Sequence, residues 1–233
     1  MMRLDPLRQM LMLILAAALA FAVFAARPGI DLWVTGLFFN TATGLFSMDS
    51  GLPNTIRLAI WRLSEAMLMA SVMAVVVGLW TKADVLAVPR RVSAYILTLY
   101  LLAPGLLVDG ILKRLWGRAR PADVTEFGGT LLFTPPHLFA HQCARNCSFV
   151  AGEMAGAVAL AVAVVMIVHL WKDRISARAY RGAVAVAVLL PVYAGFQRIA
   201  AGRHFLSDVI FATLFVLMVA VALRAIMFRP AAR

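Results

Sequence analysis

Residues 92–121 read VSAYILTLYLLAPGLLVDGIL followed by KRLWGRARP. The first part, residues 92–112, is apolar except for a few small polar side chains and Asp109. About 20 apolar residues make a helix long enough to cross the hydrocarbon core of a bilayer. One lysine and three arginines then follow in the segment 113–120. This stretch therefore predicts a transmembrane helix that ends in a strongly basic segment.

The composition of the whole chain agrees with a membrane protein. Of its 233 residues, 63% are hydrophobic and 14% are charged, whereas an average soluble domain is about 45–50% apolar and about 25% charged. A soluble core of this size cannot bury so much apolar surface, so lipid is the expected solvent. We therefore expect residues 1–233 to form a single integral membrane domain.

Six stretches are long and apolar enough to span a bilayer. The predicted spans are 7–26, 56–80, 92–112, 149–171, 183–200 and 208–227. The expected fold is all-α, a polytopic bundle of six transmembrane helices. Residues 1–30 resemble a signal peptide, but their apolar run exceeds the roughly 7–15 residues of a signal core, so we expect an uncleaved signal anchor. The aromatic segment 31–46 is too short to span and is expected at the membrane interface.

The basic residues between the spans predict an orientation. With six spans, both termini and the second and fourth loops lie on the same side. That side carries Arg3, Arg8, Lys82, Arg90, Arg91, Lys172, Arg174, Arg178, Arg181, Arg224, Arg229 and Arg233. Cytoplasmic loops hold an excess of lysine and arginine. We therefore expect cytoplasmic termini in a bacterial inner membrane and a periplasmic loop 113–148, and the net charge of +11 needs no nucleic-acid partner.

Two groups of cations break this pattern because they lie on the opposite, periplasmic side. Six residues separate Lys113 from Arg120, five separate Arg198 from His204, and three separate His204 from Asp208. Ionisable groups at membrane depth are costly and usually face a cavity or a partner. Two such groups on the same face predict a shared binding site for an anion.

These spacings, K-x6-R-P and R-x5-H-x3-D, resemble the first and third motifs of the type 2 phosphatidic acid phosphatase superfamily, over about residues 30–225. The resemblance implies a lipid phosphatase with no metal and no cofactor. His204 would be the nucleophile that forms a phosphohistidine, with Asp208 as its partner. Lys113, Arg120 and Arg198 would bind the phosphate. The chemistry agrees, since a phosphoryl group in transit spreads charge over three oxygens and neutral histidine is a nucleophile.

The second motif of that family departs from its usual form, Pro-Ser-Gly-His. Here the aligned residues are Val150, Ala151, Gly152 and Glu153. The serine that would bind phosphate is Ala151, and the histidine that would protonate the leaving group is Glu153. Gly152 keeps an N–H for the anion at a helix N-terminus. Glu153 is a candidate general acid if burial favours its protonated form, and the alternatives are an inactive site or a better leaving group.

The substrate expected from the resemblance is an anionic lipid. Segments 109–121, 126–129, 143–149 and 202–208 resemble lipid A phosphatase-like proteins of alphaproteobacteria, which implies removal of the 1-phosphate of lipid A. Undecaprenyl diphosphate, phosphatidylglycerol phosphate and phosphatidate present a similar anion and are alternative substrates. A non-catalytic protein that binds or transports anionic lipids is a second class of function, which the changes in motif two favour.

Cys143 and Cys147 lie on the predicted periplasmic side, where an oxidising environment favours a disulfide. Such a bond would restrain the approach to Gly152 and Glu153. A thiol oxidoreductase is a third class of function, although C-x3-C lacks the context of a redox domain.

Two shorter spacings predict ion pairs on helices. Asp109 precedes Lys113 by four residues, a spacing that can orient the lysine. Glu65 follows Arg62 by three residues inside the second span and is expected to pair with it.

Overall fold

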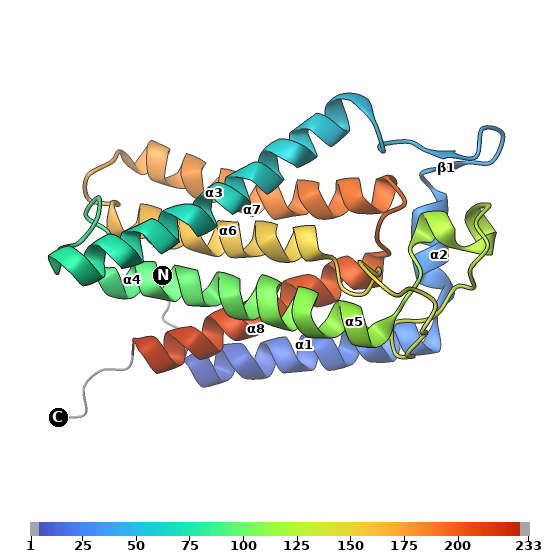
Figure 1. The fold of residues 1–233 in the computed structure, drawn as a ribbon, viewed down its shortest axis with the longest axis horizontal. Coiled ribbons are helices and arrows are strands. Elements are labelled where there is room, and N and C mark those ends of the chain that lie inside the picture. Colours follow the sequence, from blue (N-terminus) through green and yellow to red (C-terminus); the bar gives the residue numbers. More distant parts are fainter. Residues whose placement is uncertain (1–4, 229–233) are drawn as a thin grey trace.

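The computed structural model describes residues 5–228 and consists of a bundle of long helices (Figure 1). Six of the described helices are long and apolar enough to cross a membrane. They are α1 (Pro6–Ala26), α3 (Gly51–Thr81), the helix formed by α4 (Arg90–Tyr100), η1 (Leu101–Leu112) and α5 (Lys113–Trp116), α6 (Gly152–Leu170), α7 (Ala177–Ala200) and α8 (Leu206–Met227). The predicted all-α fold with six spans is confirmed. Arg3, Arg229 and Arg233 lie outside the described residues.

The third span combines three types of winding. Its middle part, η1, is a π-helix that contains Pro104. Proline has no N–H and its ring clashes with the carbonyl four residues earlier, and the wider π winding relieves both problems. The helix ends at Gly117, whose φ of 57° lies in the left-handed region. A side chain at Gly117 would lie 2.8 Å from the backbone of His141, so the glycine lets the following loop pack against the helix end.

The centre of the bundle is α6, which packs against α3, α7 and α8. Its buried face contains Ala155, Gly156, Ala159 and Ala163. Small residues let helix backbones approach closely, which is the main source of association between helices in lipid. The outer surface is apolar: on α1, for example, leucines at positions 7, 11, 15 and 19 are 54–73% exposed. The bundle thus has the inside and the outside of a membrane protein.

The short elements gather at one end of the bundle, and the described termini lie at the other end (Figure 1). They are α2 (Gly29–Gly36), the hairpin of β1 (Phe39–Asn40) and β2 (Leu45–Phe46), and the 3₁₀ turns η2 (Pro121–Asp123) and η3 (Thr125–Phe127). Aromatic rings fill the small core beneath them, where Phe127 contacts Phe39 and Phe46. The segment expected at the interface is therefore α2 and this hairpin, although α2 also carries the buried residues Asp31 and Thr35.

Arg118 connects this end of the bundle to the start of α8. Its side chain is fully buried, with Nη2 2.8 Å from an oxygen of Asp31 and Nη1 2.6 Å from an oxygen of Asp208. Its Nε donates to the carbonyl of Thr134, and the guanidinium lies 4.3 Å from the centre of the Phe205 ring. The expectation that the whole basic segment shares one substrate anion is thus wrong for Arg118, which binds two carboxylates of the protein itself.

Asp31 depends on this pairing because burial raises its pKa, whereas the nearby Arg118 lowers it. Its carboxylate also accepts hydrogen bonds from the backbone N–H and the hydroxyl of Ser207, at 2.9 and 2.6 Å. One buried network thereby joins α2, the loop after α5 and the first turn of α8.

We predict that Arg118→Met strongly destabilises the fold, because it leaves the buried Asp31 and Asp208 without their cation. Removing one partner of a buried ion pair costs about 3–5 kcal/mol. Thermal unfolding of the purified protein in detergent measures the loss. Arg62→Met is the matched control, since Arg62 pairs with Glu65 on the surface and its side chain is 74% exposed; that pair contributes about 0–1 kcal/mol. Equal unfolding temperatures for the two variants would contradict the role of Arg118.

Candidate active site

A cavity of about 950 Å³ opens at the end of the bundle that carries the short elements. Both groups of cations predicted from the sequence contribute to its wall, although they come from different helices. The predicted residues that line it are Lys113, Arg120, Gly152, Glu153, Arg198 and His204. Asp208 lies behind this wall and is fully buried. The structure therefore brings together the residues of all three motifs.

His204 lies in the turn between α7 and α8, with its ring almost completely buried. Its Nδ1 is 2.8 Å from the main-chain carbonyl of Ser148. A carbonyl can only accept a hydrogen bond, so Nδ1 carries the hydrogen and Nε2 keeps a lone pair. Burial lowers the pKa of His204, while Asp208 opposes this effect. The ring is thus held neutral, in the tautomer that a nucleophile attacking through Nε2 requires.

Asp208 is near this ring but is not its direct hydrogen-bond partner, since its Oδ2 lies 3.8 Å from Nδ1. The oxygens of Asp208 accept from Arg118, from the hydroxyl of Ser148 at 2.5 Å and from the N–H of Phe205 at 2.9 Å. Ser148 therefore connects the two residues, because its hydroxyl binds Asp208 and its carbonyl binds His204. The predicted direct pairing is replaced by this relay, since other donors already occupy the carboxylate.

Lys113 is positioned by two neighbours. Its Nζ lies 2.8 Å from an oxygen of Asp109, the pair that the spacing predicts. Gly152, the first residue of α6, packs directly against it, since a Cβ at this position would lie 2.5 Å from Nζ. The ammonium group thus lies at the N-terminus of a long helix, where backbone N–H groups also attract anions.

Glu153 is held by two arginines. One of its oxygens accepts from Arg198 at 3.0 Å and from Arg57 at 2.8 Å. Two guanidinium groups stabilise a charged carboxylate, not the protonated form that a general acid needs. We therefore interpret Glu153 as an ion-pair partner of Arg198, in place of the expected general acid. The buried Nε of Arg198 has no hydrogen-bond partner among residues 5–228, which leaves one donor for a ligand.

Three residues of the site were not recognised from the sequence. Arg57 lies near the start of α3, and its pairing with Glu153 joins positions 96 residues apart. Ser148 and Asn146 lie close to motif two, but both act partly through main-chain carbonyls. A main-chain carbonyl is present in every residue, so no motif could have indicated these roles.

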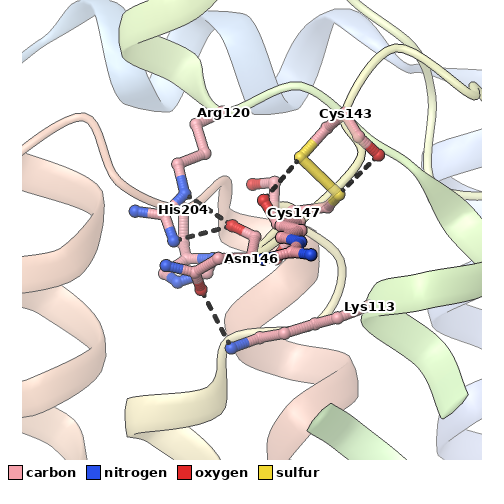
Figure 2. The surroundings of a disulfide bond; sticks show 8 residues. Lys113, Arg120, Cys143, Asn146, Cys147 and His204 are labelled. Carbon is pink, nitrogen blue, oxygen red and sulfur yellow. Dashed lines mark hydrogen bonds between the residues drawn. A yellow bond between two sulfur atoms is a disulfide. The ribbon is translucent and has the colours of Figure 1, made fainter. Parts of the chain in front are cut away.

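Cys143 and Cys147 form a disulfide beside the cavity, as expected (Figure 2). Figure 2 shows that the loop between them brings Asn146 close to Lys113, Arg120 and His204. In the described part of the chain, no group of three or more His, Cys, Asp or Glu side chains is arranged to hold a metal ion.

Comparison with known proteins identifies the family. The model of the PAP2 superfamily, the type 2 phosphatidic acid phosphatases, matches residues 93–231. The chain belongs to the PAP2 superfamily. As a PAP2 protein it is a membrane phosphatase, which confirms the family and the class of enzyme expected from the motifs.

Curated relatives of this PAP2 chain carry a more specific name. A "Lipid A 4'-phosphatase" of Rhizobium leguminosarum is 31% identical over 88% of the chain and 90% of its own length. A "Lipid A 4'-phosphatase" of Francisella tularensis subsp. novicida (strain U112) is 28% identical over 90% of the chain and 91% of its own length. Both names refer to the 4' position, so they do not support the 1-phosphate expected from the sequence.

A solved structure supports the fold. It is the first transmembrane PAP2-type phosphatidylglycerolphosphate phosphatase from Bacillus subtilis, and it matches with a TM-score of 0.56 over 98% of both chains. At 17% identity the match concerns the PAP2 fold alone.

We predict that Gly152→Ala lowers phosphatase activity about tenfold or more without a comparable loss of stability. The new methyl group would displace the ammonium group of Lys113, which is the flexible end of a long side chain and can move at little cost to the fold. Activity and thermal stability in detergent are measured together. Gly182→Ala in α7 is the control, since nothing lies within 4 Å of the added Cβ. Wild-type activity in Gly152→Ala would exclude a close role for Lys113.

Proposed function

We propose that this PAP2 protein removes the 4'-phosphate of lipid A through a phosphohistidine on His204. The observation that carries the proposal is the state of this ring: Nδ1 binds the carbonyl of Ser148, so Nε2 is free at a cavity lined by Lys113, Arg120 and Arg198. The choice of the 4' position rests on the names of the relatives. It replaces the 1-phosphate as the expected substrate.

In the first step, the three cations bind the non-bridging oxygens of the phosphate ester. Nε2 of His204 attacks phosphorus, the N–P bond forms and the bond from phosphorus to the sugar oxygen breaks. The imidazole then carries positive charge. The carbonyl of Ser148 and the carboxylate of Asp208, 3.8 Å from Nδ1, stabilise that charge. In the second step, water attacks phosphorus, inorganic phosphate leaves and the neutral ring is restored.

The leaving group at the 4' position is an ordinary sugar alkoxide, which needs a proton. Glu153 is ion-paired with Arg57 and Arg198, so we assign to it the positioning of Arg198. The mouth of the cavity is open to solvent, and the side chain of Asp109 there is 53% exposed. We propose that the proton comes from water at this mouth.

The basic residues support a periplasmic site in one integral membrane domain. Lys82, Arg91 and Arg174 belong to the end of the bundle opposite the cavity, which is also the end of the described termini (Figure 1). Since lysine and arginine accumulate on the cytoplasmic side, we propose that the termini face the cytoplasm and that the cavity faces the periplasm.

The experiment uses purified protein in detergent, lipid A with both phosphates, and mass spectrometry of the product. We predict that the wild type releases inorganic phosphate and that fragmentation places the loss at the 4' position. His204→Ala should reduce the rate by about 10³-fold or more, because it removes the nucleophile. His169→Ala is the control, since His169 lies in the last turn of α6, beside Tyr180 and away from the cavity.

Each contrary result has a distinct meaning. Loss of the 1-phosphate would show that the proposed position is wrong. Full activity in His204→Ala would exclude the phosphohistidine. Binding of lipid A without release of phosphate, in wild-type protein that is fully folded, would identify a binding protein instead of an enzyme.

A further inference from the structure

The proposed phosphate site lacks donors that its family pattern normally includes. Ala151 occupies the serine position of motif two, is fully buried and has only a methyl group. Glu153 occupies the histidine position, and its carboxylate is engaged by two arginines. Another residue would have to supply the missing hydrogen bond to a bound phosphate.

Asn146 lies where such a donor is needed. Its main-chain oxygen accepts two hydrogen bonds from Arg120, from Nε at 3.1 Å and from Nη2 at 2.8 Å. Its side-chain oxygen accepts from Nζ of Lys113 at 3.5 Å. Figure 2 shows Asn146 between these two cations and beside His204, and the residue lines the same cavity. One residue thus contacts two of the three proposed phosphate ligands.

The orientation of the Asn146 amide follows from its partner. Lysine has only donors, so the atom that faces Nζ of Lys113 is the amide oxygen. The amide nitrogen then has two N–H groups, which no protein contact described for residues 5–228 uses. Arg120 has five N–H groups, of which the carbonyl of Asn146 occupies one on Nε and one on Nη2. Both side chains therefore retain donors for an anion.

The backbone holds Asn146 in this position from both sides. Its φ of 52° lies in the left-handed region, which asparagine adopts more readily than most residues. The preceding loop is closed by the disulfide between Cys143 and Cys147, four positions apart. On the other side, the N–H of Ser148 donates to the carbonyl of Arg118 at 2.9 Å. Such restraint lowers the entropy that is lost when a ligand orders the loop.

We propose that Asn146 is a phosphate-binding residue that supplies the donor missing at Ala151. Its side-chain N–H groups donate to a phosphate oxygen, and its two oxygens hold Lys113 and Arg120 in place for the same anion. The ligand is a phosphate monoester or inorganic phosphate. The proposal rests on the proposed function, because it assumes that the cavity binds phosphate.

The test measures inhibition by inorganic phosphate during hydrolysis of a lipid phosphate, in full-length protein. Asn146→Gly tolerates the same φ and keeps the main-chain carbonyl but removes the amide. It should raise the inhibition constant of phosphate about tenfold, which corresponds to one hydrogen bond to a charged group. Asn146→Asp keeps the shape and the acceptor but replaces the donor with negative charge, so it should raise the constant further.

Two more variants complete the test. Asn40→Asp is the matched control, because Oδ1 of Asn40 only accepts hydrogen bonds from the N–H groups of Ala42 and Thr43 in the hairpin turn; phosphate inhibition should not change. Cys143→Ser combined with Cys147→Ser releases the loop and should raise the inhibition constant as Asn146→Gly does. An unchanged constant in this double variant would overturn the role of the disulfide.

The outcomes separate this proposal from the proposed function. If both Asn146 variants keep the wild-type inhibition constant while His204→Ala is inactive, the role of Asn146 is wrong and the phosphatase site stands. If the wild type neither releases phosphate nor is inhibited by it, the proposed function itself fails.

Discussion

The buried pairing of Arg118 with Asp31 and Asp208 determines how the rest of the site is arranged. A buried charge is tolerated only when partners and hydrogen bonds compensate for its lost hydration. Here both ion pairs are fully buried, with N–O distances of 2.8 and 2.6 Å. Because Arg118 precedes Arg120 by two residues, the same pairing that closes the end of the bundle also positions a phosphate ligand. Asp208, fixed by Arg118, orients Ser148, and Ser148 orients His204.

The fold was predictable because a bilayer permits few backbone structures. Each apolar stretch must satisfy its own hydrogen bonds, so six such stretches predict six helices. The ends were less predictable: α3 and α7 begin at Gly51 and Ala177, before their apolar runs, since polar residues continue a helix outside lipid. The π-helix around Pro104 was not expected, because its winding depends on how neighbouring helices pack.

The site was predictable where chemistry requires particular side chains at particular spacings. The motifs identified Lys113, Arg120, Arg198 and His204, and the structure places all four around one cavity. The interpretation of Glu153 failed because its partner Arg57 lies 96 residues away in sequence. The contribution of Asn146 could not be predicted, since it depends on a loop conformation and on a main-chain oxygen.

The central claim is that His204 attacks phosphorus through Nε2, and trapping the phosphorylated enzyme tests it most directly. Protein mixed with lipid A that carries labelled phosphate at the 4' position would be denatured in alkali, where phosphohistidine is stable and acyl phosphates are not. Mass spectrometry of the peptides would then locate the label. The account predicts phosphate on Nε2 of His204 in the wild type and none in Asp109→Asn or wild-type controls without substrate beyond what turnover supplies. Label on another residue, or rapid turnover with no labelled histidine at any time, would contradict it.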